Sequence, residues 1–172
     1  MEKDIAQEVI SNAVFRMRES TRMVGISLEQ LSEEDVWKRP NSASNSVGNL
    51  ILHLCGNITQ YAIASLGELK DTREREAEFA QTSGFSKEQL WAKLQDTVNK
   101  ACSTMEAASL EQLLEKREVQ GFNFSGIGVI MHVVEHYSYH TGQIAFWTKI
   151  VKDKDLGFYD GLDLTIKNKP KK

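Results

Sequence analysis

The 172-residue sequence has few prolines, few cysteines and no long apolar run. Its two prolines are Pro40, in a linker, and Pro170, in the tail, so neither interrupts a long segment, which favours an all-helical chain. Two cysteines, Cys55 and Cys102, cannot make a disulfide framework, so we expect reduced thiols and a cytoplasmic protein. No apolar run approaches the ~20 residues of a membrane span, and the charged start, MEKDIAQEV, has no signal-peptide core. We therefore expect no membrane partner.

Positive charge is also scarce in the body of the chain. The formal net charge is −3, but the last six residues, KNKPKK, hold four lysines. Without them, 17 basic residues remain against 24 acidic ones, a net charge of −7. Because phosphate contacts need a positive surface, we expect no nucleic-acid partner. We interpret residues 167–172 as a basic, disordered tail and residues 1–166 as one domain.

Apolar residues recur at spacings of three and four, as in helices that bury one face. The second predicted helix is apolar almost all round but carries one polar stripe, His53, Asn57 and Gln60. Four long helices of this kind predict an all-α four-helix bundle with long inter-helix connections, which permit a crossover topology. The predicted helices span residues 3–31, 46–66, 87–107 and 126–152, with short capped turns after Ser32 and Ser109 and connections at 32–45, 67–85 and 115–126.

Histidine is rare, and three of the four histidines fall in residues 131–147, MHVVEHYSYHTGQIAFW. His132, His136 and His140 are four apart, a rise of ~6 Å on a helix, so they share one face. A pair at this spacing can hold one metal ion, and His53 on another apolar helix could be a third ligand. The spacing alone leaves both 132/136 and 136/140 open as the pair. A lone histidine on an apolar face is usually a packed residue, but this combination favours a metal site.

Three histidines without a thiolate would form an open site, whose fourth position takes water or substrate. Imidazole suits zinc, nickel, copper or ferrous iron, so these ligands do not choose the metal. Second-shell groups should orient the rings. Asn57, four residues beyond His53, and Gln143, three beyond His140, are the candidates.

The segment HVVEHYSYHTGQI resembles the signature of the DinB/YfiT-like superfamily of metal-binding four-helix proteins. Members carry a histidine within a helix-two segment like SVGNLILHLCGN, and a His-x3-His followed by Gly-Gln in the last long helix. The resemblance covers residues 3 to 152, and its Tyr-x-x-His-x-Gly-Gln form is most like an uncharacterised bacterial branch. Many members have arginine where this chain has Thr141.

The resemblance implies a DinB/YfiT-like bundle with a divalent metal, zinc or nickel most often, on His53, His136 and His140 rather than His132. It also implies a homodimer. Characterised relatives include transferases and isomerases that use low-molecular-weight thiols such as bacillithiol or mycothiol. The function hypothesis is therefore a metal-dependent thiol S-transferase acting on a small-molecule substrate.

Two alternatives stay open: a non-catalytic bundle in which the metal only ties two helices together, and a hydrolase that uses metal-bound hydroxide. A closed fourth coordination position would favour the structural alternative. An open position facing a pocket would favour an enzyme.

Overall fold

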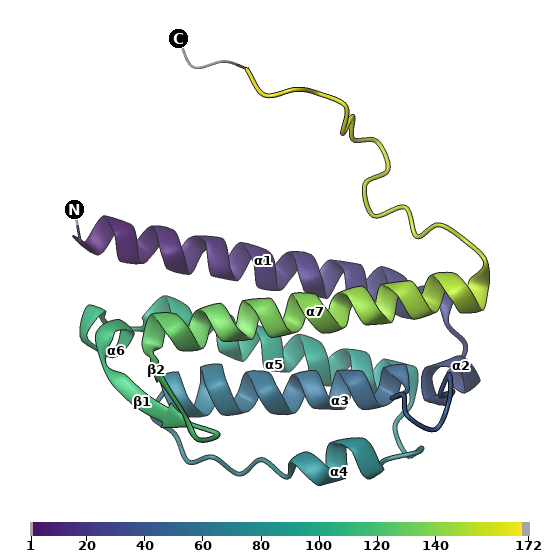
Figure 1. The fold of residues 1–172 in the computed structure, drawn as a ribbon, viewed down its shortest axis with the longest axis horizontal. Helices are drawn as coiled ribbons and strands as arrows, with labels where there is room; N and C mark the ends of the chain where they lie inside the picture. Colours follow the sequence, from purple (N-terminus) through teal and green to yellow (C-terminus); the bar gives the residue numbers. More distant parts are fainter. Residues whose placement is uncertain (1, 170–172) are drawn as a thin grey trace.

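A computed structural model of the chain describes residues 2–169. Four long helical segments lie side by side (Figure 1), and one of them changes from α-helix to π-helix along its length. They are α1 (Glu2–Gln30), α3 (Val47–Ile58) continued by the π-helix η1 (Thr59–Leu66), α5 (Lys87–Ala107) and α7 (Gly126–Lys152). The predicted all-α bundle is thus confirmed, with helix limits within a residue or two of those expected.

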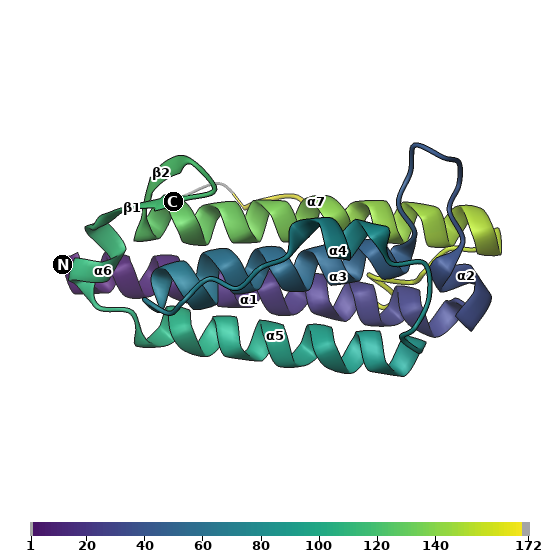
Figure 2. The same ribbon diagram turned by 90° about the horizontal axis from the view of Figure 1, so that it is seen from below.

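The four helices enclose one hydrophobic core. In the ring of packed neighbours, α1 contacts α5 and α7, and α3 contacts the same two helices. Helices α1 and α7 run in one direction, and α3 and α5 in the other (Figures 1 and 2). The successive long helices α3 and α5 can be parallel because the connection between η1 and α5 returns along the length of the bundle. The long connections therefore do produce a crossover.

Serine residues fix where the helices begin. Ser32, Ser46, Ser86 and Ser109 each form a capping box, in which the side chain accepts from the backbone N–H three residues later and that later side chain accepts in return. Ser125 caps α7 through the N–H of Gly128. The caps at Ser32 and Ser109 open the two short helices expected there, α2 (Glu33–Trp37) and α6 (Leu110–Leu114).

The connection at 115–126, for which the sequence predicts no helix or strand, has regular structure. It forms an antiparallel hairpin of β1 (Lys116–Val119) and β2 (Phe122–Ser125). The turn residues Gln120 and Gly121 have φ of 51° and 79°, the positive values that a tight two-residue hairpin turn requires. The hairpin packs against the start of α7 and against η1.

The connection at 67–85 carries the short helix α4 (Arg75–Ala80), a helical turn that the sequence left open. Figure 2 shows α4 lying along α3, and the two helices are in contact. Its carboxyl end is tied to α3 because Nδ2 of Asn49 donates to the carbonyl oxygens of Glu78 and Gln81, at 3.0 and 2.6 Å. This attachment brings the charged side chains of α4 to the surface of the apolar helix α3.

After α7 the chain has no further helix or strand up to residue 169. Leu156 is buried, whereas Leu162, Leu164 and Ile166 are exposed. Of the tail expected at 167–172, residues 170–172 lie outside the described residues. Among the helices described, none combines the length and apolar character needed to cross a membrane.

Candidate metal centre

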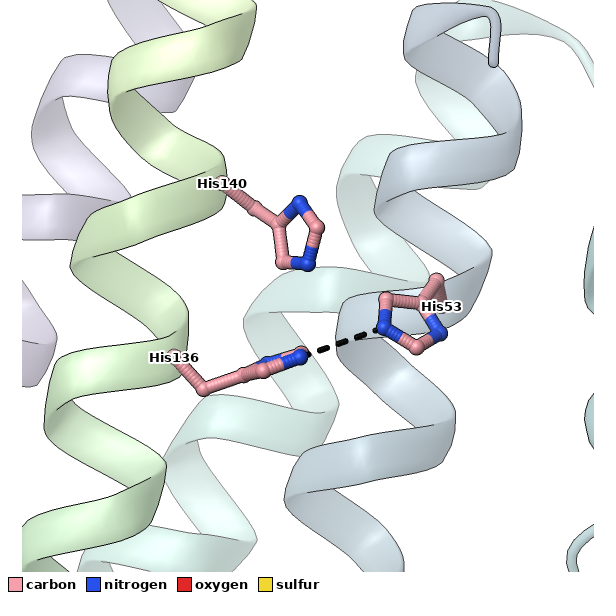
Figure 3. Close-up of side chains that lie close together, drawn as sticks. All are labelled: His53, His136 and His140. Carbon is pink, nitrogen blue, oxygen red and sulfur yellow. Dashed lines mark hydrogen bonds between the residues drawn. The ribbon is translucent and has the colours of Figure 1, made fainter. Parts of the chain in front are cut away.

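His53 from α3 and His136 and His140 from α7 meet between the two helices, with their rings turned toward one another (Figure 3). The Nε2 atoms of His53 and His136 are 3.2 Å apart. One nitrogen from each of the three rings lies within 4.8 Å of the other two. The histidines that the sequence places on separate helices therefore do converge.

Hydrogen bonds on the far side of two rings orient them. Nδ1 of His140 lies 2.7 Å from Oε1 of Gln143, an acceptor, so this Nδ1 carries the proton and Nε2 keeps its lone pair. Nδ1 of His53 lies 3.0 Å from Oε2 of Glu78, which favours the same tautomer, and 3.1 Å from Nη2 of Arg73, a donor that favours the other. The Nε2 atoms of both rings face the space between the rings, as in histidines that bind metal. The predicted role of Gln143 in orienting His140 is consistent with this bond.

Glu78 is itself held by Arg73, a residue of the segment that precedes α4. The guanidinium donates to both carboxylate oxygens, at 2.7 and 2.8 Å, and to Oε1 of Gln60 at 2.9 Å. Burial alone would raise the pKa of Glu78, but hydrogen bonds from Arg73 and His53 outweigh it and keep the pKa below its usual value. Glu78 is therefore a carboxylate at neutral pH and can only accept from His53.

Gly56 makes room for this carboxylate on the surface of α3. It lies three residues after His53, and a Cβ there would be 1.9 Å from Oε1 of Glu78 and 2.9 Å from Nε of Arg73. No other residue type fits unless the ion pair moves. The helix thus combines a histidine with a glycine one turn later, and α4 supplies the acid.

The two converging histidines of α7, His136 and His140, remain neutral near pH 7. Burial, together with the neighbouring histidines, lowers the pKa of His136 to about 3. Burial also lowers the pKa of His140, although its bond to Gln143 opposes the shift. Neutral imidazole is the form that binds metal ions.

His132 lies outside this group, although it shares a face with His136. Its ring stacks on Tyr61, with centroids 4.0 Å apart, and its Nε2 lies 3.3 Å from Nδ2 of Asn57. Asn57, expected to orient one of the three converging histidines, therefore contacts His132 instead. Asn57 lies about one turn further along α3 than His53, and there it is opposite His132 rather than His136.

The three histidines open on one side into a pocket of about 730 Å³. Its walls come from α3, α4, α7 and the loop before α3, and include Leu50, Phe79 and Trp147. Cys55 faces away from it and is buried, and burial raises the pKa of its thiol to about 11. This thiol is therefore no ligand and no nucleophile of the site.

Residues 4–160 match the sequence profile of a protein family of unknown function, DUF1572. The chain belongs to the DUF1572 family. No curated protein sequence matches it significantly.

Solved structures of DinB-like proteins share the fold of this DUF1572 protein, which confirms the resemblance noted in the sequence. A DinB-like protein (YjoA) from Bacillus subtilis is 16% identical with a TM-score of 0.61, and the match covers 84% of this chain and 91% of the other. A DinB-like protein from Bacillus cereus is 13% identical with a TM-score of 0.66, at the same coverages. A conserved protein from Enterococcus faecalis is 17% identical with a TM-score of 0.63, and covers 88% and 97%. At these identities the likeness establishes the fold.

The donor set of the DUF1572 protein fits a divalent ion. A tetrahedral ion with bonds of ~2.0–2.1 Å holds its nitrogens about 3.4 Å apart. The Nε2 atoms of His53 and His136 are 3.2 Å apart, and His140 offers a nitrogen within 4.8 Å of the other two. With no ion, the 3.2 Å contact between two Nε2 atoms requires a proton on one of them, and Nδ1 of His136 is buried without a partner in the described chain. That proton is what a bound cation would replace.

Three residues of the site escaped sequence reasoning: Gly56, Arg73 and Glu78. The second and third lie in a charged connection without a periodic pattern. The one available signal is His53 itself, because a histidine in an apolar helix needs a polar partner, which can come from another segment of the chain. That reasoning directs attention to the acids of 67–85 but does not select Glu78.

Proposed function

We propose that this DUF1572 protein binds one divalent metal ion, zinc or nickel, through His53, His136 and His140, and transfers a low-molecular-weight thiol to a small electrophilic substrate. The observation that carries the proposal is the convergence of three imidazole nitrogens, from His53, His136 and His140, within 4.8 Å of one another. Glu78 and Gln143 lie against Nδ1 of His53 and of His140, so the Nε2 atoms of these rings face the space between them. Such buried, preorganised nitrogens have no evident structural purpose without a cation.

The chain's own residues would orient the ligands, exclude water and hold the substrate. Arg73 fixes Glu78 and so the His53 ring, and the apolar side chains of Phe79 and Trp147 line the pocket beside the three imidazoles. A divalent ion held there would lower the pKa of a bound thiol and fix the position of its sulfur.

The pocket supports an enzyme over a purely structural site. All three histidines line it, so the side of the site away from the helices faces a volume large enough for a small molecule. A metal that served only to join α3 and α7 would be enclosed by protein ligands. The buried, unpaired Cys55 and Cys102 further suit the reducing cytoplasm, which we propose as the location of the protein.

A thiol-transfer assay tests the proposal. Purified protein, loaded with zinc or nickel, is mixed with 1-chloro-2,4-dinitrobenzene and, in separate reactions, bacillithiol, mycothiol or coenzyme A. In the expected reaction the sulfur forms a bond to the ring carbon and chloride leaves. We expect turnover with one of the thiols, loss of turnover after chelation and recovery when metal is restored. Turnover that a chelator leaves unchanged would contradict the proposal, and hydrolysis of ester substrates in place of transfer would favour the hydrolase.

A further inference from the structure

The pocket beside the three histidines has one permanently charged lining residue, Arg75 at the start of α4. Apart from the three histidines, most of the other lining residues are apolar, among them Val47, Leu50, Phe79, Phe146, Trp147 and Ile150. A single cation in an apolar pocket selects a ligand of matching character.

Arg75 has little to bind within the described chain. The one carboxylate near it, that of Glu76, is 3.7 Å away, beyond hydrogen-bond distance, and the Glu76 side chain is 94% exposed. The two other arginines of this region are engaged: Arg73 holds Glu78, and Arg39 donates to Asn49 and to the carbonyl of Phe79. The charge of Arg75 is therefore available to a ligand.

Aromatic contacts place this guanidinium relative to the histidines. It lies over the ring of Phe79, 4.9 Å from the centroid, and the Phe79 ring lies 4.8 Å from the ring of His53. The two contacts in series keep the charge within about 10 Å of His53. That distance is spanned by one aromatic ring with a short side chain.

We propose that the pocket takes a small substrate with an apolar body and one carboxylate, the carboxylate pairing with Arg75 while the body packs against Phe79 and Trp147 and reaches the three histidines. This inference rests on the proposed function, since it names the class of substrate that the metal site would act on. Arginine suits this task because its planar fork can donate two hydrogen bonds to a carboxylate.

Binding of a matched pair of probes tests the proposal. The affinities of 4-phenylbutanoate and its neutral amide, 4-phenylbutanamide, are measured by titration calorimetry on zinc-loaded and on metal-free protein. We expect the carboxylate to bind about tenfold more tightly than the amide in both preparations, as one partly exposed charge-assisted contact allows. Because the metal-free protein cannot bind the carboxylate through an ion, its preference reports Arg75 alone.

Two variants separate Arg75 from general charge. Arg75→Gln should abolish the preference, because it weakens the binding of 4-phenylbutanoate and leaves the affinity for 4-phenylbutanamide unchanged. Arg16→Gln is the matched control, because Arg16 on α1 lies similarly over an aromatic ring, 5.6 Å from the centroid of Phe15, and does not line the pocket. It should keep the preference.

Equal affinities of the two probes, a preference that survives Arg75→Gln, or no binding of either probe at millimolar concentration would each overturn this inference. Metal content is measured on the same samples. A protein that holds no metal but keeps an Arg75-dependent preference would refute the proposed function and leave the carboxylate site standing.

Discussion

Gly56 is the single residue whose substitution should test the support of His53 most cleanly. In Gly56→Ala the added methyl group displaces the carboxylate of Glu78, because the Cβ would lie 1.9 Å from Oε1. His53 then loses its acceptor, and we expect metal affinity to fall roughly 10- to 100-fold, as for other losses of a partner that orients a ligand. Loss of the buried ion pair should also lower the free energy of unfolding by about 1–3 kcal/mol.

The control is Gly142→Ala on α7, two residues beyond His140. A Cβ at this position meets nothing within 4 Å. Alanine is the better helix former, so we expect this variant to gain up to about 1 kcal/mol of stability and to keep its metal affinity. The two affinities come from competition with a chelating indicator. Equal affinities in the two variants would show that the carboxylate does not govern His53.

The depressed pKa of His136 predicts how acid affects the metal-free protein. The unfolded chain binds a proton at this residue below about pH 6.5, whereas the folded chain does so only near pH 3. Between these values protons favour the unfolded state, so the free energy of unfolding should fall as pH drops from about 6.5 toward 3. Thermal unfolding at pH 7 and pH 5 should show a smaller loss for His136→Gln than for the wild type. An equal loss in both would mean that His136 titrates normally when folded.

Among the elements, η1 depends on the hairpin that follows α6. Nη1 of Arg117 on β1 donates to the carbonyl of Ser65 in the last turn of η1, at 2.7 Å, and Nη2 donates to the carbonyl of Gln112, at 2.8 Å. Carbonyls at a helix end have no partner within the helix, so a donor from elsewhere stabilises the end. The hairpin thus fixes the end of the segment that carries Gln60 and Tyr61.

Arg117→Gln should therefore destabilise the protein by about 1–3 kcal/mol, through the loss of the hydrogen bonds that the guanidinium donates to Ser65 and Gln112. Lys116→Gln, an exposed neighbour, serves as the control and should change stability by no more than about 0.5 kcal/mol. Chemical denaturation gives both values, and hydrogen exchange should quicken in residues 59–66 of Arg117→Gln alone. Unchanged exchange there would argue against this support.

The sequence predicts the helices well because their signals are local. Each serine cap and each apolar spacing lies within one element, and the ends at Ser46, Ser86 and Ser125 follow from them. The hairpin escapes because its strands are only four residues long. The first, KREV, is mostly charged, and the alternation of the second, FNFS, is too short to mark a strand. The π-helical turn escapes because its sequence continues the apolar pattern of α3.

In the candidate site, too, the residues with local signals are predictable and those placed by tertiary contacts are not. The positions of His53, His136 and His140 on two buried helices are visible in the sequence, and the resemblance selects 136 and 140 over 132. Glu78 and Arg73 reach His53 only through the path of the connection at 67–85, which is a tertiary feature. Close approach across a glycine likewise has no signature in a single sequence.

For the whole molecule, we propose a homodimer formed through apolar surface that the bundle leaves uncovered. Much of the apolar surface of α7 is buried within the chain, as at Val129 and Ile130, but Met131, Phe146 and Ile150 are exposed. The segment after α7 could have covered them, yet its Leu162 and Ile166 are themselves exposed. Exposed apolar side chains gathered on one helix favour contact with a second subunit.

Sedimentation equilibrium at micromolar concentration tests the dimer. We expect a species of twice the 19.4 kDa chain mass. A single species at the chain mass would rule out a stable dimer. Because Phe146 and Ile150 also line the pocket, a dimer formed there would place partner residues beside the proposed substrate site.

The claim that the three histidines hold a metal is tested most directly by elemental analysis of protein purified without a histidine tag. We expect about one zinc or nickel ion per chain in the wild type, nearly the same in His132→Ala, and little or none in His136→Ala. The reason is that the Nε2 of His136 faces the Nε2 of His53 at 3.2 Å, whereas His132 is engaged by Asn57 and Tyr61. A wild type that carries no divalent ion even after incubation with zinc and nickel, or equal metal loss in the two variants, would contradict the assignment.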